Sequence, residues 1–270
     1  MFIDSHCHLN FPELQAQLPT ILSDMQAAHV VKALCISTTL TNFEDVHALA
    51  MAHPHLWATV GVHPDEEDTP EPSLDDLIQG AARDKVVGIG ETGLDYYRLN
   101  GRSVADMAWQ RERFRIHIRA ARQLDLPLII HTRQASEDTL AILKEEGGFD
   151  GSGGFPPAKG VFHCFTEAEN VAKAALDLGF YISFSGILTF KSAQEIRDVA
   201  AIVPLERTLI ETDSPYLAPV PDRGTTNPPT LVPYVAHELA KIHGTDAEHI
   251  GHQTSDNFHR LFNRVSLNAS

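Results

Sequence analysis

Two histidines separated by one residue, His6 and His8, stand near the start of the chain, shortly after the apolar residues Phe2 and Ile3. In an extended strand, side chains at positions i and i+2 lie on the same face. A rise of roughly 3.3 Å per residue separates the two imidazoles by about 6 to 7 Å, so they can converge on one metal ion. Neutral imidazole is a common metal ligand. The spacing alone leaves open the alternative that the two histidines have no common function.

Eight short apolar runs recur along the chain, and the segments between them have helical periodicity. The runs are Phe2–Asp4, Val31–Ser37, Leu56–Val62, Val86–Gly90, Leu128–Ile130, Val161–Phe162, Phe180–Phe184 and Thr208–Ile210. Continuous rather than alternating apolarity is typical of strands that are covered on both faces, as in a parallel sheet. A strand followed by a helix, eight times over, predicts an α/β fold of the (β/α)8 TIM-barrel class, with residues 1–270 as a single domain.

Helix signals support this organisation. An apolar stripe at Met107, Phe114, Ile118 and Ala121 predicts one core-facing side of a long helix. Pairs with capping-box spacing predict four helix starts. They are Thr41/Glu44, Thr166/Glu169, Ser192/Glu195 and Thr245/Glu248. Two Gly- or Pro-rich stretches, 147–157 and 217–229, predict long loops, and the second follows the eighth strand, where it can cover an active site.

Metal-binding residue types gather at the ends of the predicted strands. In a TIM barrel, polar residues at the carboxyl ends of strands tend to be functional. Five strand ends here supply four histidines, one glutamate and one aspartate. They are His6, His8, Glu91, His131, His163 and Asp213. Because these strand ends surround a common axis, we expect the six side chains to meet in one site.

This set suits two divalent ions about 3.5 to 4 Å apart, which need one carboxylate that reaches both. The predicted assignment gives one ion His6, His8 and Asp213 and the other ion His131 and His163, with Glu91 between them. Few protein ligands leave positions for water and substrate, as in catalytic sites. The expected chemistry is attack by a hydroxide held at the two ions. Asp213 is expected to orient the water and accept its proton, so Asp213 and Glu91 are the predicted catalytic residues.

Other residues near these strand ends have more than one interpretation. Arg133, two residues after His131, is the natural clamp for a phosphate oxygen, although it also suits a salt bridge to Glu91. His63 is predicted to bind substrate or to support a metal ligand. Asp4 suits either the orientation of a ligand histidine or the capping of backbone N–H groups. Tyr96 and Tyr97 suit packing slightly better than base stacking.

Composition narrows the class of partner. The formal net charge of −15 argues against broad binding of duplex nucleic acid, which needs a basic surface. A phosphate substrate remains compatible, because metal ions supply positive charge locally. Neither a membrane span nor a signal peptide is visible, and the three cysteines are too few and too widely spaced for a disulfide framework. We therefore expect a cytoplasmic protein with buried thiols, no membrane partner and no obligate protein partner.

Taken together, these motifs resemble the TatD family of metal-dependent deoxyribonucleases, within the amidohydrolase superfamily. The motifs are residues 2–9, 88–97, 131–133, 163–166 and 211–219, with a further match at 257–262. The resemblance covers nearly the whole chain. It implies a TIM-barrel hydrolase with two divalent ions (Mg, Mn or Zn) and the same six ligands. It also implies a 3′–5′ exonuclease that acts on a DNA 3′ end.

The sequence departs from the family pattern in three places, all of which we expect near the substrate groove. Thr225 and Thr226 follow Arg223-Gly224 where a basic residue is common, Glu167 replaces a small residue, and the loop 147–160 is longer than usual. Loss of a cation near the expected substrate groove weakens the DNA assignment. The alternative is hydrolysis of a small phosphodiester, an ester, a lactone or an aminoacyl-tRNA linkage by the same centre. A non-enzymatic scaffold is the third hypothesis, although all six ligands have the correct type.

Overall fold

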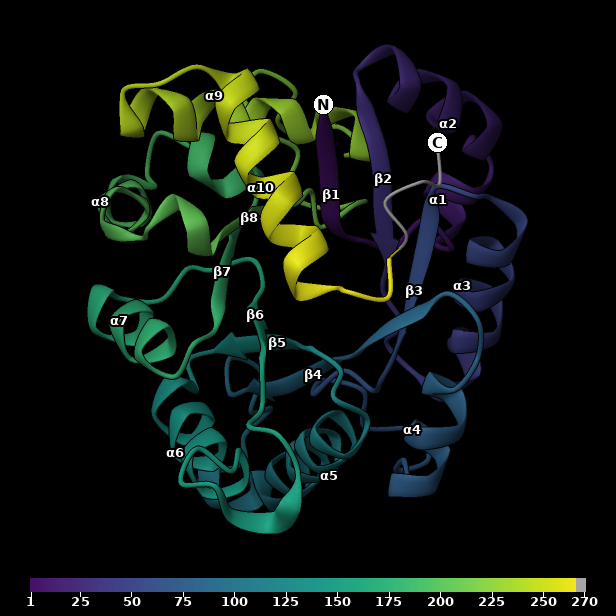
Figure 1. The fold of residues 1–270 in the computed structure, drawn as a ribbon, viewed down its shortest axis with the longest axis vertical. Helices are drawn as coiled ribbons and strands as arrows, with labels where there is room; N and C mark the ends of the chain where they lie inside the picture. Colours follow the sequence, from purple (N-terminus) through teal and green to yellow (C-terminus); the bar gives the residue numbers. More distant parts are fainter. Residues whose placement is uncertain (266–270) are drawn as a thin grey trace.

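The computed structural model describes residues 1–265, in which eight parallel strands form one sheet in chain order (Figure 1). The strands are β1 (Phe2–Cys7), β2 (Val30–Cys35), β3 (Leu56–Val60), β4 (Val86–Asp95), β5 (Leu128–Arg133), β6 (Gly160–Phe162), β7 (Tyr181–Phe184) and β8 (Thr208–Ile210). The sheet closes just beyond β8, where the Asp213 N–H donates to His6 O and the His8 N–H donates to Ser214 O, both at 2.9 Å. The predicted (β/α)8 barrel is confirmed.

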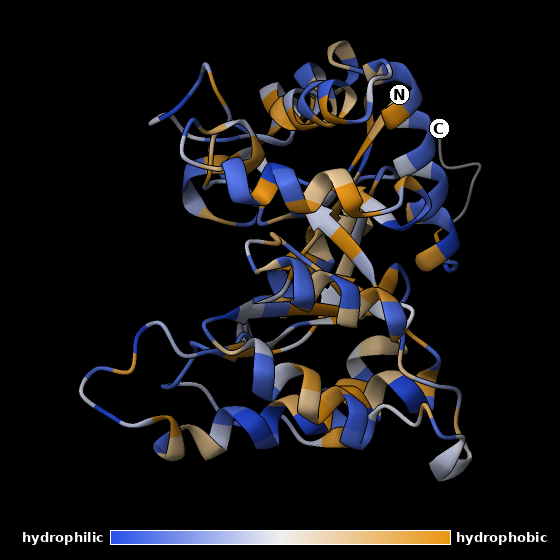
Figure 2. Cartoon of the chain, turned by 90° about the vertical axis from the view of Figure 1, so that its left-hand side faces the viewer, coloured by the Kyte–Doolittle hydropathy of each residue, from blue (hydrophilic) through white to orange (hydrophobic). Residues whose placement is uncertain are grey.

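The helices lie around the strands and pack their apolar sides inward (Figures 1 and 2). The α-helices are α1 (Pro12–Gln15), α2 (Leu18–Ala27), α3 (Leu40–Ala52), α4 (Leu74–Ala81), α5 (Ala108–Leu124), α6 (Ser136–Glu146), α7 (Glu169–Asp177), α8 (Gln194–Ile202), α9 (Val232–His243) and α10 (Ala247–Leu261). The short 3-10 helices are η1 (Val104–Met107), η2 (Ser152–Gly154), η3 (Gly186–Thr189), η4 (Leu205–Arg207) and η5 (Pro229–Leu231). The predicted stripe on α5 and η1 is fully buried. Among the described residues, no helix combines the length and apolarity needed to cross a membrane.

The amino-terminal end of the barrel is sealed by side chains. One buried residue from each strand belongs to a single apolar cluster, together with residues at the end of α10. The strand residues are Ile3, Leu34, Trp57, Val87, Ile129, Val161, Tyr181 and Leu209, and Phe258 and Phe262 lie with them. A filled layer of this kind makes the barrel interior a packed core. The polar residues at the ends of β1, β4 and β5, and His163 directly after β6, therefore lie at the other end, where the strands finish.

Strand β4 continues further than the sequence predicts. The predicted apolar run ends at Gly90, but the strand extends to Asp95 because Thr92 to Asp95 pair in register with β5. A register shift separates Ile89 from Thr92. Glu91 lies at this irregularity and is almost fully buried, so its carboxylate occupies the barrel interior.

All four predicted capping boxes are wrong. Helix α3 begins two residues earlier than expected, where the Thr39 and Asn42 side chains cap each other's backbone N–H groups. The side chain of Asp246 caps α10 in place of Thr245, and α7 and α8 begin without a side-chain cap. The Ser/Thr-x-x-Glu spacing recurs by chance in a polar sequence, so the spacing alone does not locate a helix start.

The loop 147–160 lies away from the carboxyl ends of the strands. It precedes β6, so it belongs to the amino-terminal end of the barrel, and the Arg122 guanidinium holds it by donating to Glu146 O (2.7 Å) and Ser152 O (2.6 Å). The expectation that it borders a substrate groove is therefore wrong. All three cysteines are free thiols; Cys7 and Cys35 are buried and Cys164 is partly buried.

A buried histidine on α5 gives a prediction about stability. His117 Nε2 accepts from the Val62 N–H (3.0 Å), and its Nδ1–H donates to Arg113 O (2.8 Å). Burial lowers the pKa of His117 to about 4 from its ordinary 6.5. The unfolded chain therefore binds more protons between these values, so the free energy of unfolding should fall by about 3 kcal/mol as pH drops from 6.5 to 4.

Urea unfolding of the metal-free protein at several pH values measures this contribution. A glutamine at position 117 carries both an acceptor and a donor without a titrating group. The His117→Gln variant should therefore show a flatter pH dependence than the unsubstituted protein across this window. Identical pH dependences would remove His117 as the cause.

Candidate metal centre

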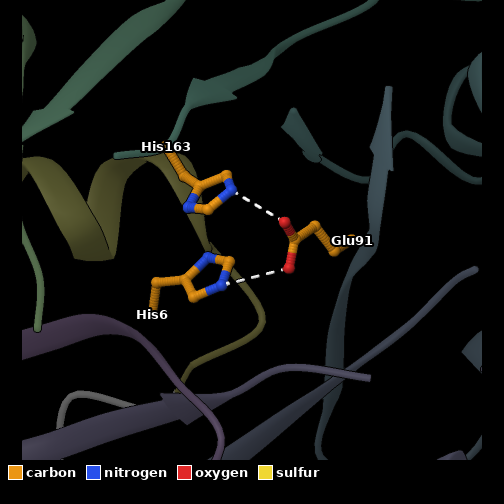
Figure 3. A group of neighbouring side chains, drawn as sticks. All are labelled: His6, Glu91 and His163. Carbon is orange, nitrogen blue, oxygen red and sulfur yellow. Dashed lines mark ion pairs between the residues drawn. The ribbon is translucent and has the colours of Figure 1, made fainter. Parts of the chain in front are cut away.

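The Glu91 carboxylate lies among the predicted ligands, and Figure 3 shows its two oxygens facing the imidazoles of His6 and His163. Its Oε2 is 3.3 Å from His6 Nε2 and 3.9 Å from His8 Nε2. Its Oε1 is 2.8 Å from His163 Nε2 and 3.3 Å from His131 Nδ1. The two oxygens thus face different imidazoles, and His6, Glu91 and His163 also lie close enough together to hold one ion. The division of the six ligands between two ions stays a prediction.

Asp213 joins the group on the Oε2 side. Its Oδ1 lies 3.7 Å from both His6 Nε2 and His8 Nε2. The backbone of Asp213 adopts a left-handed conformation (φ 59°) directly after β8, and its N–H donates to His6 O. The contact that closes the barrel therefore also brings this carboxylate to the histidine pair. The alternative that Asp213 only caps a turn does not account for its position against the two imidazoles.

Hydrogen bonds on the outer side of three ligand rings fix their tautomers. The acceptors are Ile36 O for His8 Nδ1 (3.2 Å), Asp95 Oδ2 for His131 Nε2 (2.9 Å) and Glu211 Oε1 for His163 Nδ1 (3.2 Å). Carbonyl and carboxylate oxygens accept hydrogen bonds, so in each neutral ring the outer nitrogen carries the proton. The inner nitrogen then presents its lone pair to the centre. Such outer partners are typical of metal-binding histidines.

The donor set fits divalent cations. Imidazole lone pairs that face carboxylate oxygens at 2.8 to 3.9 Å are repelled by them unless a proton or a metal cation lies between the two atoms. Ligand bonds of about 2.0 to 2.2 Å place neighbouring ligand atoms roughly 3 to 3.5 Å apart, close to the separations here. Within the described residues, His163 Nε2 makes no hydrogen bond although it lies 2.8 Å from Glu91 Oε1. Mixed nitrogen and oxygen donors suit zinc and manganese and also accept magnesium.

The ionisation of Glu91 and Asp213 determines the charge of the candidate centre. Burial would raise the pKa of Glu91, but the imidazoles of His163, His63 and His6 hold that pKa well below its usual range. Burial likewise opposes ionisation of Asp213, yet the neighbouring imidazoles of His8, His6 and His163 keep the pKa of this carboxyl below its ordinary value. Both carboxylates are therefore ionised at neutral pH.

His63 supports Glu91 in this structure. The Asp65 N–H donates to His63 Nδ1 (3.0 Å), so the proton of the neutral ring is on Nε2. That Nε2 lies 3.3 Å from Glu91 Oε1. His63 therefore presents a donor to the central carboxylate, which agrees with the prediction of a supporting residue. It also lines the cavity above the centre, so the prediction of substrate binding remains open.

The cavity above Glu91 has a volume of about 760 Å³ and is lined by His63, Arg133 and, unexpectedly, Arg98. Arg133 makes no salt bridge to Glu91; its guanidinium stacks 3.6 Å from the centre of the Tyr97 ring. The stacking of Arg133 on Tyr97 excludes its salt bridge to Glu91. The Arg133 guanidinium therefore stays at the cavity wall. Tyr96, by contrast, is buried and donates to Asp138 Oδ2 (2.6 Å), so the packing interpretation holds for it.

Two supporting carboxylates were not given roles from the sequence. Asp95 and Glu211 hold the outer nitrogens of His131 and His163. Both residues stand in strand-end motifs, Asp95 in the motif of Glu91 and Glu211 in the motif of Asp213, so a second acidic residue in each motif was the available signal. Asp4 behaves differently, because it accepts from the Thr212 side chain and from backbone N–H groups rather than from a ligand ring. The capping interpretation of Asp4 is therefore the correct one.

Removing the Glu211 side chain should weaken the ion on the His163 side. Without this acceptor the His163 ring loses both its tautomer and its orientation, which typically costs 10- to 100-fold in metal affinity. Calorimetric metal titration of Glu211→Ala should show weakening of one of the two ions.

Glu211→Gln is the matched control, since its amide oxygen still accepts from His163 and from the Cys164 N–H. Near-native affinity in Glu211→Gln and loss in Glu211→Ala are expected. Equal affinity in both variants would show that Glu211 does not orient a ligand.

Comparison with known proteins identifies relatives of this chain. The family model described as "TatD related DNase" matches residues 3–263. The chain is 44% identical over 263 residues to "Uncharacterized metal-dependent hydrolase YcfH" of Escherichia coli K12, with 96% of this chain and 95% of YcfH covered. It is 36% identical to "Uncharacterized metal-dependent hydrolase YabD" of Bacillus subtilis, with coverage of 97% and 99%.

A solved structure agrees with these sequence relatives. The crystal structure of YjjV, a TatD homologue from Escherichia coli K12, superposes with a TM-score of 0.87 at 30% identity, and the alignment covers 97% of this chain and 98% of YjjV. The similarity therefore extends over nearly all of both chains.

Proposed function

The chain belongs to the TatD-related DNase family, and from that premise we propose that it is a metal-dependent hydrolase that cleaves phosphodiester bonds at a DNA 3′ end. The observation that carries the proposal is the Glu91 carboxylate, whose two oxygens face two groups of imidazole nitrogens (Figure 3). A carboxylate that reaches two metal positions suits displacement at phosphorus, because negative charge on both the attacking and the leaving oxygen must be neutralised.

The proposed ligands are the six residues predicted from the sequence, for two ions of Mg, Mn or Zn. Bound there, such ions would polarise a phosphoryl oxygen and lower the pKa of a water molecule. Glu91 holds both groups of donors at a fixed separation. Asp213, at the edge of the cavity, orients the attacking water and accepts its proton.

Substrate recognition falls to residues of the cavity wall. The Arg133 guanidinium, held flat on Tyr97, is positioned to bind two oxygens of one phosphate. His63 keeps Glu91 oriented through its Nε2–H. The net charge of −15 disfavours extended contact with duplex DNA, so a free or unpaired end is the favoured form of substrate.

Hydrolysis of a small phosphodiester, an ester, a lactone or an aminoacyl-tRNA linkage is the second candidate. The cavity wall contains the acidic residues Asp65 and Glu66, and Arg98 lies 3.7 Å from Asp65. Asp65 therefore offsets part of the charge of Arg98, which weakens this side of the cavity as a site for a long polyanion. The Thr226 departure from the family pattern points in the same direction.

A parallel assay separates the candidates. The metal-free protein is reconstituted with Mg, Mn or Zn and incubated with a single-stranded oligonucleotide that carries a label near its 5′ end, and with a panel of small esters and lactones. The proposal expects a ladder of products shortened from the 3′ end with at least one metal. Ester hydrolysis without any shortening of the oligonucleotide would favour the second candidate.

A further inference from the structure

One side of the cavity is aromatic. Tyr216 stands three residues after Asp213, and 56% of its surface is exposed. The Phe11 ring approaches it edge-on, with 6.2 Å between ring centroids, and stacks in turn on the His8 ring at 4.9 Å. Both aromatic residues line the cavity. An apolar ring surface therefore begins directly beside a predicted metal ligand.

The Tyr216 backbone is fixed. Its N–H donates to Asp213 O (2.9 Å), and its carbonyl accepts from the Asn227 side chain (2.5 Å). Asn227 is completely buried and also donates to Thr212 O (2.9 Å). A single exposed tyrosine needs no explanation. Here, however, buried hydrogen bonds hold an exposed ring at the rim of the candidate centre, so its position is set relative to Asp213.

The opposite side of the cavity carries the cations. Arg98 and Arg133 come from the ends of β4 and β5, whereas Tyr216 and Phe11 follow β8 and β1. In a closed barrel with strands in the order 1 to 8, these two pairs of strands lie across the axis from each other (Figure 1). Glu91 and its imidazoles lie between the two walls.

The two sides of the last phosphate at a DNA 3′ end differ in the same way as the two walls of the cavity. If the phosphate under attack lies at the centre, the nucleoside on its 3′ side has a base and no further phosphate. The chain on its 5′ side carries a phosphate for every nucleotide. A wall of aromatic rings without an arginine suits the first, and a wall with two guanidinium groups suits the second.

We infer that the cavity binds a single-stranded 3′ end in one direction, with the terminal base stacked on Tyr216 and Phe11 and the preceding phosphates against the arginine wall. This inference rests on the proposed nuclease function and assigns Tyr216 a part in substrate specificity. Stacking of one base on an aromatic side chain is worth about 1–3 kcal/mol and tolerates any base. The protein should consequently accept all four terminal nucleotides.

The test measures kcat/KM of the metal-reconstituted protein on three single-stranded oligonucleotides. One has a normal 3′ end, one has a base-free sugar as its last residue, and one has a base-free sugar next to last. For the normal end, Tyr216→Ala should lower kcat/KM about tenfold. Tyr216→Phe should remain near the unsubstituted protein, because it retains the ring. Val220→Ala changes an exposed side chain of the same loop outside the cavity and should have no effect.

The pattern across substrates decides the direction. With the last base missing, Tyr216→Ala and the unsubstituted protein should cleave at the same rate, and with the next-to-last base missing the tenfold difference should persist. A difference that disappears only when the next-to-last base is missing would overturn the inferred direction. Equal losses on all three substrates would overturn stacking altogether. Failure of the unsubstituted protein to cleave any oligonucleotide with any metal would instead overturn the proposed function, and the inference with it.

Discussion

Replacement of Glu91 by glutamine should reduce the bound metal from two ions per chain to one or fewer and lower hydrolysis by about 10⁴-fold or more. A carboxylate offers one oxygen to each group of donors, whereas an amide offers one oxygen and an NH₂ group that cannot bind a metal. Both oxygens of Glu91 already face imidazole lone pairs. The measurements are metal content by mass spectrometry after reconstitution and the rate on a 3′ end.

The same substitution should lower the midpoint of thermal unfolding at neutral pH even without metal. The imidazoles of His163, His63 and His6 stabilise the ionised Glu91 carboxylate, and a neutral amide loses that interaction. With metal present, the difference should widen, because only the unsubstituted protein gains stability from two bound ions. A Glu91→Gln variant that binds two ions and retains hydrolysis would contradict the bridging role.

The second large effect concerns Asp213. The Asp213→Asn variant should retain both ions, because an amide oxygen remains beside His6 and His8 and the other ligands are unchanged. Hydrolysis should fall by roughly 10²- to 10⁴-fold, the usual contribution of a general base. The asparagine cannot accept a proton from the attacking water.

Metal content separates this role from simple ligation. Near-native metal content with a lost rate supports Asp213 as the proton acceptor. Loss of one ion in proportion to the loss of rate would make Asp213 a ligand only. Full activity would remove it from the mechanism.

The barrel could be predicted because its signals are local and repeated. Each strand is a short apolar run, and covered parallel strands need no alternation. Helix starts were predicted poorly, since the true cap of α3 is the Thr39–Asn42 pair and the sequence offers several equivalent spacings. The length of β4 was also missed, because pairing with β5 outweighs the glycines at positions 90 and 93.

The grouping of the ligands could be predicted because the carboxyl ends of all strands lie at the same end of a closed barrel. Residues that are far apart in the chain are therefore neighbours there. His6 and Asp213 are 207 positions apart in the chain, but the closing contact joins them. The supporting partners were harder to assign. Nothing in the local sequence distinguishes Glu211, which orients His163, from Asp213 two positions later. Only the structure shows that the Glu211 side chain turns toward His163. The roles of Arg98 and Tyr216 likewise depend on the shape of the cavity.

The central claim is that Glu91 lies between two metal ions, and anomalous diffraction from crystals soaked in manganese tests it most directly. The account predicts two peaks about 3.5 to 4 Å apart. One should lie beside His6, His8 and Asp213, and the other beside His131 and His163, with one Glu91 oxygen bound to each. A single peak, or a pair of peaks with only one in contact with Glu91, would contradict it.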